Sequence, residues 1–259
     1  MRGKCALITG STAGLGYAIA DRLAAEGCRI ILNGLAPAQD AENARASLAQ
    51  RHDVDVRFHD ADLAAPERIE DLMGFADDAF GGVDILVNNA VVRHFAPIEE
   101  FPVARWNEAL AVNLSAAFHT VRLALPGMRR RGWGRIVNLA SVFSFTAVED
   151  RVDYITTKAA ILGFTRAVAI ETVKSEITCN AIAPGVLPTP AILGRLEQIA
   201  REEGISTEQA THDYLAAKQP GGKFVPLDNV AGLVAFLCGP NSQGITGAVF
   251  PVDGGWTIV

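Results

Sequence analysis

The sequence predicts a doubly wound α/β fold with seven mostly parallel strands and helices on both faces of the sheet. Short β-branched runs alternate with longer helical patterns along the chain, which is typical of βαβ units with right-handed crossovers. A glycine-rich turn separates the first strand from the first helix. The 259 residues are 49% hydrophobic and contain no repeat or linker, so we expect a single domain over residues 1–259.

The predicted strands are apolar or β-branched runs of five or six residues. They lie at residues 5–9, 29–33, 54–59, 84–88, 135–139, 177–182 and 247–252. Amphipathic or polar helical patterns fill the intervals. They lie at residues 15–26 and 41–50, from Pro66 onward, at residues 103–130, and around Tyr154 and Lys158. Pro66 suits a first helical turn, and we expect an interruption of helix 103–130 near Asn113 or Pro126.

A segment rich in proline and glycine follows the sixth strand. Residues 188–220 hold two short helical patterns between such residues. A long insertion at the carboxyl end of a strand is typical of a lid over a binding site. We therefore expect a helical substrate lid there.

Composition and charge exclude several classes of function. A net charge of −6 argues against a nucleic-acid partner, because phosphate binding requires a basic face. No apolar stretch is long enough to span a bilayer, so no membrane partner is expected. The four scattered cysteines and the lack of a signal-peptide pattern favour the cytoplasm. No cluster with metal-ligand spacing occurs, so we predict no catalytic metal.

The glycine turn indicates a dinucleotide site of the Rossmann type. Gly10, Gly14 and Gly16 follow the first strand and open the first helix, where the backbone can approach a pyrophosphate. Asp62, after the third strand, either accepts a hydrogen bond from an adenine amino group or caps a helix. The second strand ends in the uncharged residues 33–36, and Thr12 is also uncharged. A 2′-phosphate requires a cation, so we expect NAD rather than NADP.

Tyr154 and Lys158 share one face of a predicted helix, thirteen residues or more after Ser141. A free phenol ionises near pH 10, and a neighbouring ammonium favours the phenolate. A serine hydroxyl beside them can hold a substrate oxygen while the tyrosine transfers a proton. By spacing alone, however, such a pair also fits a solvated helix face with a half-buried ring.

The ordered motifs together resemble the short-chain dehydrogenase/reductase family. They are the glycine turn, residues 88–90, Asn113, Ser141, Tyr154 with Lys158, residues 184–185, and residues 245–247 and 252–256. The resemblance spans almost the whole chain. It implies a Rossmann-type seven-stranded sheet, a nicotinamide cofactor and a homotetramer.

The resemblance also implies roles for particular residues. Tyr154 is the expected general acid/base, Ser141 the ligand of the substrate oxygen, and Asn113 a member of a proton relay through water. Lys158 is expected to bind the nicotinamide ribose and to lower the Tyr154 pKa. The expected cofactor contacts are Gly10, Thr12, Gly14, Leu15, Gly16, Leu35, Asp62, Leu63, Asn89, Ala90, Tyr154, Lys158, Pro184, Gly185 and Thr189, of which Thr189 contacts the carboxamide. Val91 stands where the family usually has glycine, and its Cβ is expected to crowd the adenosine ribose.

Within the family the chain is most similar to the NAD-dependent D-3-hydroxybutyrate dehydrogenases. Those enzymes hold the substrate carboxylate mainly with glutamine, histidine and lysine side chains. Here Arg93 and Arg195 replace glutamines, Phe143 replaces a histidine and Arg151 replaces a lysine. With Ser141 and Tyr154, these four are the expected substrate contacts.

Arginine binds carboxylates bidentately and keeps its charge. We therefore expect a larger or more anionic substrate than 3-hydroxybutyrate, with Phe143 packing on its carbon skeleton. Alternatively, the arginines point to solvent or pair with Glu149, Asp150 or Asp153.

The sequence thus favours an NAD-dependent oxidoreductase that interconverts a small hydroxy acid and its keto acid. An NADP-dependent ketoacyl or ketone reductase is the alternative within enzymes. A cofactor-binding regulatory protein that has lost catalysis is an alternative from another class. The presence of Asn113, Ser141, Tyr154 and Lys158 argues against the hypothesis of a non-catalytic protein.

Overall fold

A computed structural model describes residues 1–258 as one seven-stranded sheet with the order β3-β2-β1-β4-β5-β6-β7. Every neighbouring pair of strands in it is parallel, so the sheet is wholly rather than mostly parallel. Parallel strands covered on both faces form continuous apolar runs, as seen here. The strands are β1 (Cys5–Ile8), β2 (Arg29–Asn33), β3 (Val56–His59), β4 (Ile85–Asn88), β5 (Gly134–Leu139), β6 (Ile177–Pro184) and β7 (Val249–Val252).

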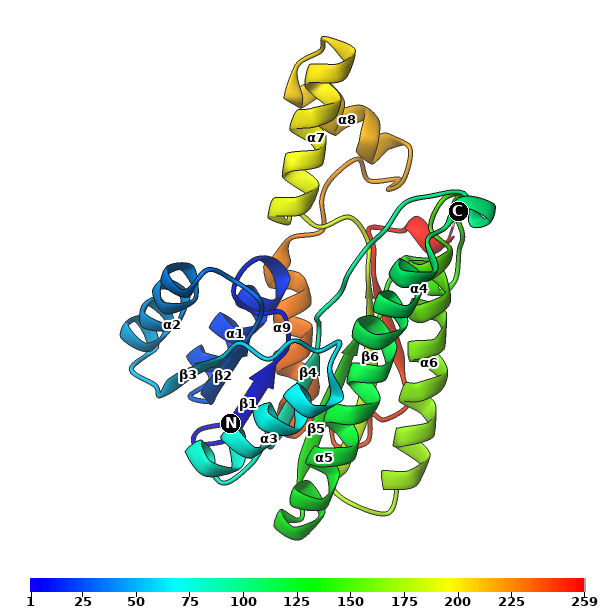
Figure 1. The fold of residues 1–259 in the computed structure, drawn as a ribbon. Helices are drawn as coiled ribbons and strands as arrows, with labels where there is room; N and C mark the ends of the chain where they lie inside the picture. Colours follow the sequence, from blue (N-terminus) through cyan, green and yellow to red (C-terminus); the bar gives the residue numbers. More distant parts are fainter. Residues whose placement is uncertain (259) are drawn as a thin grey trace.

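Helices cover both faces of this sheet (Figure 1). On one face α1 (Gly14–Ala25), α2 (Ala38–His52) and α9 (Leu227–Cys238) enclose a core that contains Ile19, Leu48 and Val234. On the other face lie α3 (Pro66–Phe80), α4 (Val103–Leu110), α5 (Ala116–Arg131) and α6 (Val152–Thr172). The core under them contains Leu72, Met128 and Val168. The predicted doubly wound architecture is confirmed.

The helix expected at residues 103–130 is interrupted at Asn113 and not at Pro126. A π-helical turn, Ala111–Ser115, joins α4 to α5, and α5 then runs through Pro126 without a break. Such turns insert one residue into a helix and are frequent at functional sites.

Two helices form the segment predicted as a lid. They are α7 (Pro190–Glu203) and α8 (Thr207–Ala216), which pack against each other and project beyond the sheet (Figure 1). The buried Gln219 anchors the return of the chain: its Oε1 accepts a hydrogen bond from the Val186 backbone nitrogen, and its amide donates to the Lys223 carbonyl. Both ends of the lid are thereby tied together at the carboxyl end of β6.

The elements that carry the predicted site residues meet at the carboxyl edge of the sheet. The chain reverses its winding between β1 and β4, the point at which open α/β sheets bind ligands. The glycine turn, residues 88–90, Ser141 and Pro184 all follow strands that end at this edge.

Candidate active site

The glycine turn after β1 has the geometry that a phosphate site needs. Gly10 and Gly14 have φ values of +61° and +58°, in the left-handed region that favours glycine. A Cβ on Gly16 would stand 2.7 Å from Asn89 Nδ2 and 2.8 Å from Ser11 Cα. Only glycine at these positions lets α1 begin so close to the sheet, with its amino-terminal N–H groups open to an anion.

Asn89 holds this turn in place. Its Nδ2 donates to the carbonyls of Thr9 and Gly10 at 2.9 and 2.8 Å, while Thr9 Oγ1 accepts from the Asn89 and Ala90 backbone nitrogens at 2.9 and 3.0 Å. The Asn89 side chain, expected to contact the cofactor, therefore positions the glycine backbone.

The end expected to hold adenosine carries no positive charge at the tip of β2. Asn33 is buried and its Nδ2 donates to the carbonyls of His59 and Ala61. Leu35 beyond it is 73% exposed, which leaves its side chain available to a ligand. A Cβ on Gly34 would stand 3.1 Å from Thr12 Oγ1, so Thr12 packs over this strand end.

Asp62 does not cap a helix, because the N-cap of α3 is Ala65. Its Oδ1 instead accepts from the Ala64 backbone nitrogen at 2.9 Å, and the side chain is exposed. The helix-cap alternative is thus wrong, and one carboxylate oxygen is left for a ligand. Leu63 beside it is buried and lies with Ala90 on the wall of a small cavity.

Asn113 in the π-turn pins the segment after β4. Its Oδ1 accepts from the Val92 nitrogen at 2.8 Å and its Nδ2 donates to the Val92 carbonyl at 3.0 Å. Val91, which directly precedes Val92, is partly exposed and is not among the residues with positive φ. Replacing the usual glycine with Val91 therefore requires no strained backbone.

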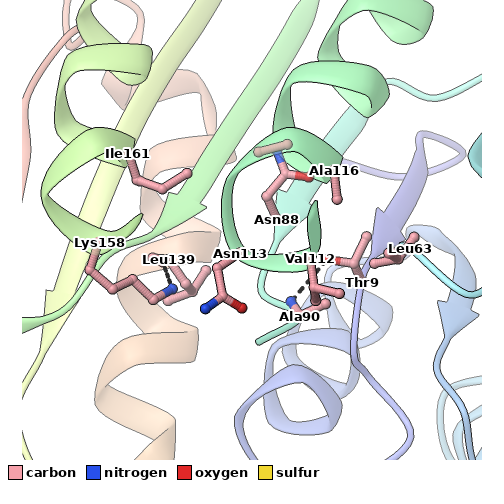
Figure 2. Close-up of a pocket in the computed structure, with 11 residues that line it drawn as sticks. Thr9, Leu63, Asn88, Ala90, Val112, Asn113, Ala116, Leu139, Lys158 and Ile161 are labelled. Carbon is pink, nitrogen blue, oxygen red and sulfur yellow. Dashed lines mark hydrogen bonds between the residues drawn. The ribbon is translucent and has the colours of Figure 1, made fainter. Parts of the chain in front are cut away.

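A small cavity separates Asn113 from Lys158 (Figure 2). The centre of a water molecule has about 10 Å³ available in this cavity. Its wall includes Thr9, Asn88 and Leu139 as well as Asn113 and Lys158. A volume of this order holds about one water. Lys158 Nζ donates to the Leu139 carbonyl at 2.5 Å.

Tyr154, Ser141 and Lys158 converge as their spacing predicts. Tyr154 is 6% exposed, and Lys158 Nζ lies 5.7 Å from its ring centroid. Ser141 Oγ accepts from the Phe143 nitrogen at 3.2 Å, and Ser144 donates to the Lys158 carbonyl at 2.7 Å. The 3₁₀ turn after β5 is thus bonded to α6 at Lys158, and Ser141 is close enough to Tyr154 to help lower its pKa.

The Tyr154 pKa is lowered from 10.0 to about 8. Burial opposes this shift, but the positive charges of Lys158 and Arg93 and hydrogen bonds from Ser141 and Arg93 outweigh burial. The Lys158 pKa is also lowered, by burial first and by Arg93 next, while Tyr154 acts in the opposite direction. The Tyr154 phenolate and the Lys158 ammonium stabilise each other, so the tyrosine can act as a base near neutral pH.

Arg151 lies among aromatic rings beside the tyrosine. Its Cζ is 4.6 Å from the Tyr154 ring centroid, 4.3 Å from that of Phe95 and 5.9 Å from that of Phe143. Burial lowers its pKa, and among residues 1–258 it has no ion-pair partner and its buried Nε has no hydrogen-bond partner. Asp153 is close enough to raise that pKa but forms no ion pair with it in this part of the chain.

Arg93 approaches the same tyrosine, whereas Arg195 pairs with an acid of the lid. The Arg93 Cζ lies 5.4 Å from the Tyr154 ring centroid, although the side chain is exposed. Arg195 NH1 is 3.9 Å from Glu202 Oε2, with both side chains about half exposed. Arg195 therefore follows the alternative in which an arginine points to solvent or pairs with an acid. Its partner is Glu202 and not one of the three acids that the sequence suggested.

Three aromatic residues of this site were not predicted. Trp256 packs edge-on against Phe143 with 5.5 Å between ring centroids, and Phe143 packs in the same manner on Tyr154 at 6.2 Å. Tyr214 of α8 is surrounded by positive charge: burial raises its pKa, while Arg151, Arg93 and Arg195 act to lower it. Phe95, 69% exposed, is the third. An aromatic residue two positions after Arg93 is a sequence signal that could have indicated Phe95.

The residues at the base of the lid fit a nicotinamide group. A Cβ on Gly14 would stand 3.8 Å from Thr189 Cβ, so the start of α7 reaches the glycine turn. The Thr189 hydroxyl is buried and has no hydrogen-bond partner among residues 1–258. Pro184 is buried and Gly185 packs on Gln219 and Asp253. A buried donor without a partner in this part of the chain, beside the glycine turn, suits the carboxamide that Thr189 is expected to contact.

Known proteins are similar to this chain over almost its full length. A family model described as Enoyl-(Acyl carrier protein) reductase matches residues 10–257. The D-beta-hydroxybutyrate dehydrogenase of Cupriavidus necator is 45% identical over 257 residues, which are 99% of this chain and 98% of that protein. This chain belongs to the short-chain dehydrogenase/reductase family.

Further members agree in sequence and fold. The D-beta-hydroxybutyrate dehydrogenase of Rhizobium meliloti is 42% identical over 254 residues, 98% of each chain. The crystal structure of L-sorbose reductase from Gluconobacter frateurii, complexed with NADPH and L-sorbose, matches with a TM-score of 0.96 at 31% identity, covering 100% of this chain and 98% of that one. The resemblance and the fold class predicted from sequence are confirmed.

As a short-chain dehydrogenase/reductase, the protein is an oxidoreductase acting on hydroxyl or keto groups, with a fold that binds a nicotinamide cofactor. Within residues 1–258, no group of three or more His, Cys, Asp or Glu side chains is placed to hold a metal ion. The same residues include no helix with the length and hydropathy of a membrane span.

Proposed function

We propose that the protein is an NAD-dependent dehydrogenase of a small hydroxy acid, which it interconverts with the keto acid. The observation that carries the proposal is Arg151, whose guanidinium has no ion-pair partner within residues 1–258 and lies 4.6 Å from the ring of a tyrosine whose pKa is about 8. Two relatives that are 45% and 42% identical to this chain are named D-beta-hydroxybutyrate dehydrogenases, which supports an acid substrate.

Tyr154 and Ser141 handle the reacting oxygen. Ser141 Oγ, oriented by the Phe143 nitrogen, donates to the substrate oxygen, and the Tyr154 phenolate accepts the hydroxyl proton. A bound nicotinamide supplies the acceptor for the hydride that leaves the carbinol carbon. In the reverse direction the Tyr154 phenol returns the proton to the carbonyl oxygen.

Lys158 and Asn113 complete the proposed proton path. The Lys158 ammonium keeps the phenolate stable, and its Nζ borders the cavity that has room for about one water. That water would connect Lys158 with the Asn113 end of the cavity, and Asn113 would stay fixed through its two bonds to Val92. The arrangement lets a proton leave Tyr154 without opening the lid.

Arg151 binds the substrate carboxylate in this proposal. A guanidinium paired with a carboxylate forms two parallel hydrogen bonds, and the rings of Phe95 and Phe143 limit its motion. Phe143, itself fixed by Trp256, packs on the carbon chain between carboxylate and hydroxyl. The distance between Arg151 and the Tyr154 hydroxyl then selects the position of the hydroxyl along the acid.

NAD is proposed over NADP because the tip of β2 offers no cation. The Asn33 side chain donates its hydrogen bonds to the carbonyls of His59 and Ala61, and Leu35, which follows, is uncharged. The alternative is an NADP-dependent ketoacyl or ketone reductase, and the L-sorbose reductase in complex with NADPH shows that a related fold holds NADPH. Titration with both oxidised nucleotides decides between them: tighter binding of NADP than NAD would overturn this part of the proposal.

We also propose a homotetramer as the working assembly. Phe118 on α5 is 50% exposed, and Ile170 on α6 is 70% exposed. Such residues on neighbouring helices are suited to a subunit interface. Light scattering after size-exclusion chromatography measures the mass, and a monomer would contradict the assignment.

The activity is tested by following NADH formation through its absorbance, with a panel of small hydroxy acids and their neutral alcohol analogues. Acids should be oxidised and the analogues that lack a carboxylate should not. Equal activity on both would remove Arg151 from substrate binding. Inactivity on every acid with either nucleotide would reject the proposed function.

A further inference from the structure

Two unpaired arginines, and not one, border the reaction centre. Lys158 is the cation that stabilises the phenolate, while Arg93 and Arg151 lie 5.4 and 4.6 Å from the same tyrosine ring. Neither arginine forms an ion pair with any other residue of 1–258. The charge at this site is therefore in excess, although the chain as a whole carries a net charge of −6.

The two guanidinium groups approach the tyrosine from different elements. Arg151 lies at the start of α6 and is enclosed by aromatic rings, whereas Arg93 lies on the loop after β4 and is exposed. They are close enough that the charge of Arg93 lowers the pKa of Arg151. Two cations held together without an anion destabilise each other, so a ligand that neutralises both would be bound strongly.

The position of Arg93 indicates where the second anionic group binds. Its guanidinium carbon lies 5.4 Å from the Tyr154 ring centroid, and its positive charge helps to lower the Tyr154 pKa. A substrate whose hydroxyl reaches Tyr154 therefore has Arg93 beside it as well as Arg151. One carboxylate engaged bidentately by Arg151 has used both of its oxygens. A second carboxylate is needed to pair with Arg93.

The lid adds further polar groups on the same side. Tyr214 of α8 is near Arg93, Arg151 and Arg195, and the Lys218 Nζ lies 3.6 Å from its ring centroid. Two acids lie near these groups: the buried Asp153, whose Oδ2 has no hydrogen-bond partner among residues 1–258, and Glu202, which pairs with Arg195. These two carboxylates do not neutralise Arg93.

We propose that the preferred substrate is a hydroxy acid with two carboxylates, one bound by Arg151 and the other by Arg93. This inference rests on the proposed function and refines it. Glutamine is expected at position 93 in the enzymes that the sequence most resembles, so Arg93→Gln removes the charge that distinguishes this chain. The added charge converts a site for a monoanion into a site for a dianion.

The test compares kcat/KM for 3-hydroxybutyrate with kcat/KM for 3-hydroxyglutarate and malate, two hydroxy diacids of different length. The wild-type enzyme should prefer one of the diacids. In Arg93→Gln the ratio of diacid to monoacid kcat/KM should fall about 10- to 100-fold, the usual effect of losing a charged hydrogen bond. Any change in the Tyr154 pKa affects both substrates alike, so the ratio isolates the second carboxylate.

The control is Arg166→Gln, which removes an exposed arginine elsewhere on α6 and should leave the ratio unchanged. Oxidation of 3-hydroxybutyrate in preference to both diacids would overturn the inference and leave the proposed function intact. An equal loss for both kinds of substrate in Arg93→Gln would overturn it as well. Failure to oxidise any of the three acids would instead count against the proposed function.

Discussion

Arg93→Gln should also move the pH dependence of oxidation, because Arg93 stabilises the Tyr154 phenolate in the free enzyme. The guanidinium carbon lies 5.4 Å from the ring centroid. Two unit charges at this separation attract by about 3 kcal/mol at an effective dielectric constant of about 20. Arg93 is exposed, so solvent screening reduces this to about 1 to 1.5 kcal/mol, equivalent to about one in pKa.

The Tyr154 pKa should therefore rise from about 8 to about 9 in the variant. At pH 7 the ionised fraction of Tyr154 would fall from about 9% to about 1%, so oxidation should slow about tenfold. Well above pH 9, where the phenolate is present in both proteins, the pH effect should vanish. Reduction of the keto acid requires the phenol, so its decline at high pH should begin about one pH unit later in the variant.

The assay is kcat/KM for oxidation between about pH 6 and pH 10, fitted to a single ionisation. Substrate binding changes the height of the plateau, whereas the phenol changes the position of the inflection, so the two effects of Arg93 are separable. Arg166→Gln should reproduce the wild-type inflection. An inflection at the same pH in Arg93→Gln would show that Arg93 does not stabilise the phenolate, and the electrostatic reasoning would be wrong.

Three further substitutions test other parts of the site. Tyr154→Phe should lower kcat about 10²- to 10⁴-fold while NADH, followed by its fluorescence, still binds; unchanged turnover would show that another group transfers the proton. Arg151→Gln should lower kcat/KM for a hydroxy acid about 10- to 100-fold. Arg151→Lys should restore little of this loss, since lysine cannot bind a carboxylate bidentately; full recovery would show that Arg151 contributes only its charge. Thr189→Val should weaken NADH binding about fivefold by titration at an unchanged melting temperature, because the hydroxyl has no partner within residues 1–258; equal affinity would exclude a contact with the carboxamide.

Much of the fold follows from local patterns. All seven strands were predicted within a few residues, because buried parallel strands give short apolar runs between clear helical periods. Helix α9 was not predicted, since its sequence is apolar at most positions and a short apolar run does not distinguish a buried helix from a buried strand. The exact bounds of β6, which extends to Pro184, depend on its pairing with β7 and are not visible in local sequence.

The proposed catalytic residues were predictable for a different reason than the proposed substrate residues. Tyr154 and Lys158 lie on one helix, so spacing alone places them together. Arg93, Tyr214 and Trp256 come from three separate segments and meet only through the packing of lid, loop and carboxyl-terminal turn. The second role of Arg93, on the tyrosine itself, could not be inferred without the distance between them.

The π-helical turn at Ala111–Ser115 restricts the number of residues that can join α4 to α5. One residue beyond α-helical spacing rotates everything that follows by about 100° relative to what precedes. This rotation lets α4 pack on α6 while α5 packs on α3 and the sheet. Deleting a residue there would turn the apolar side of α5 away from the core, so we expect this helix pair to tolerate no change of length at the π-turn.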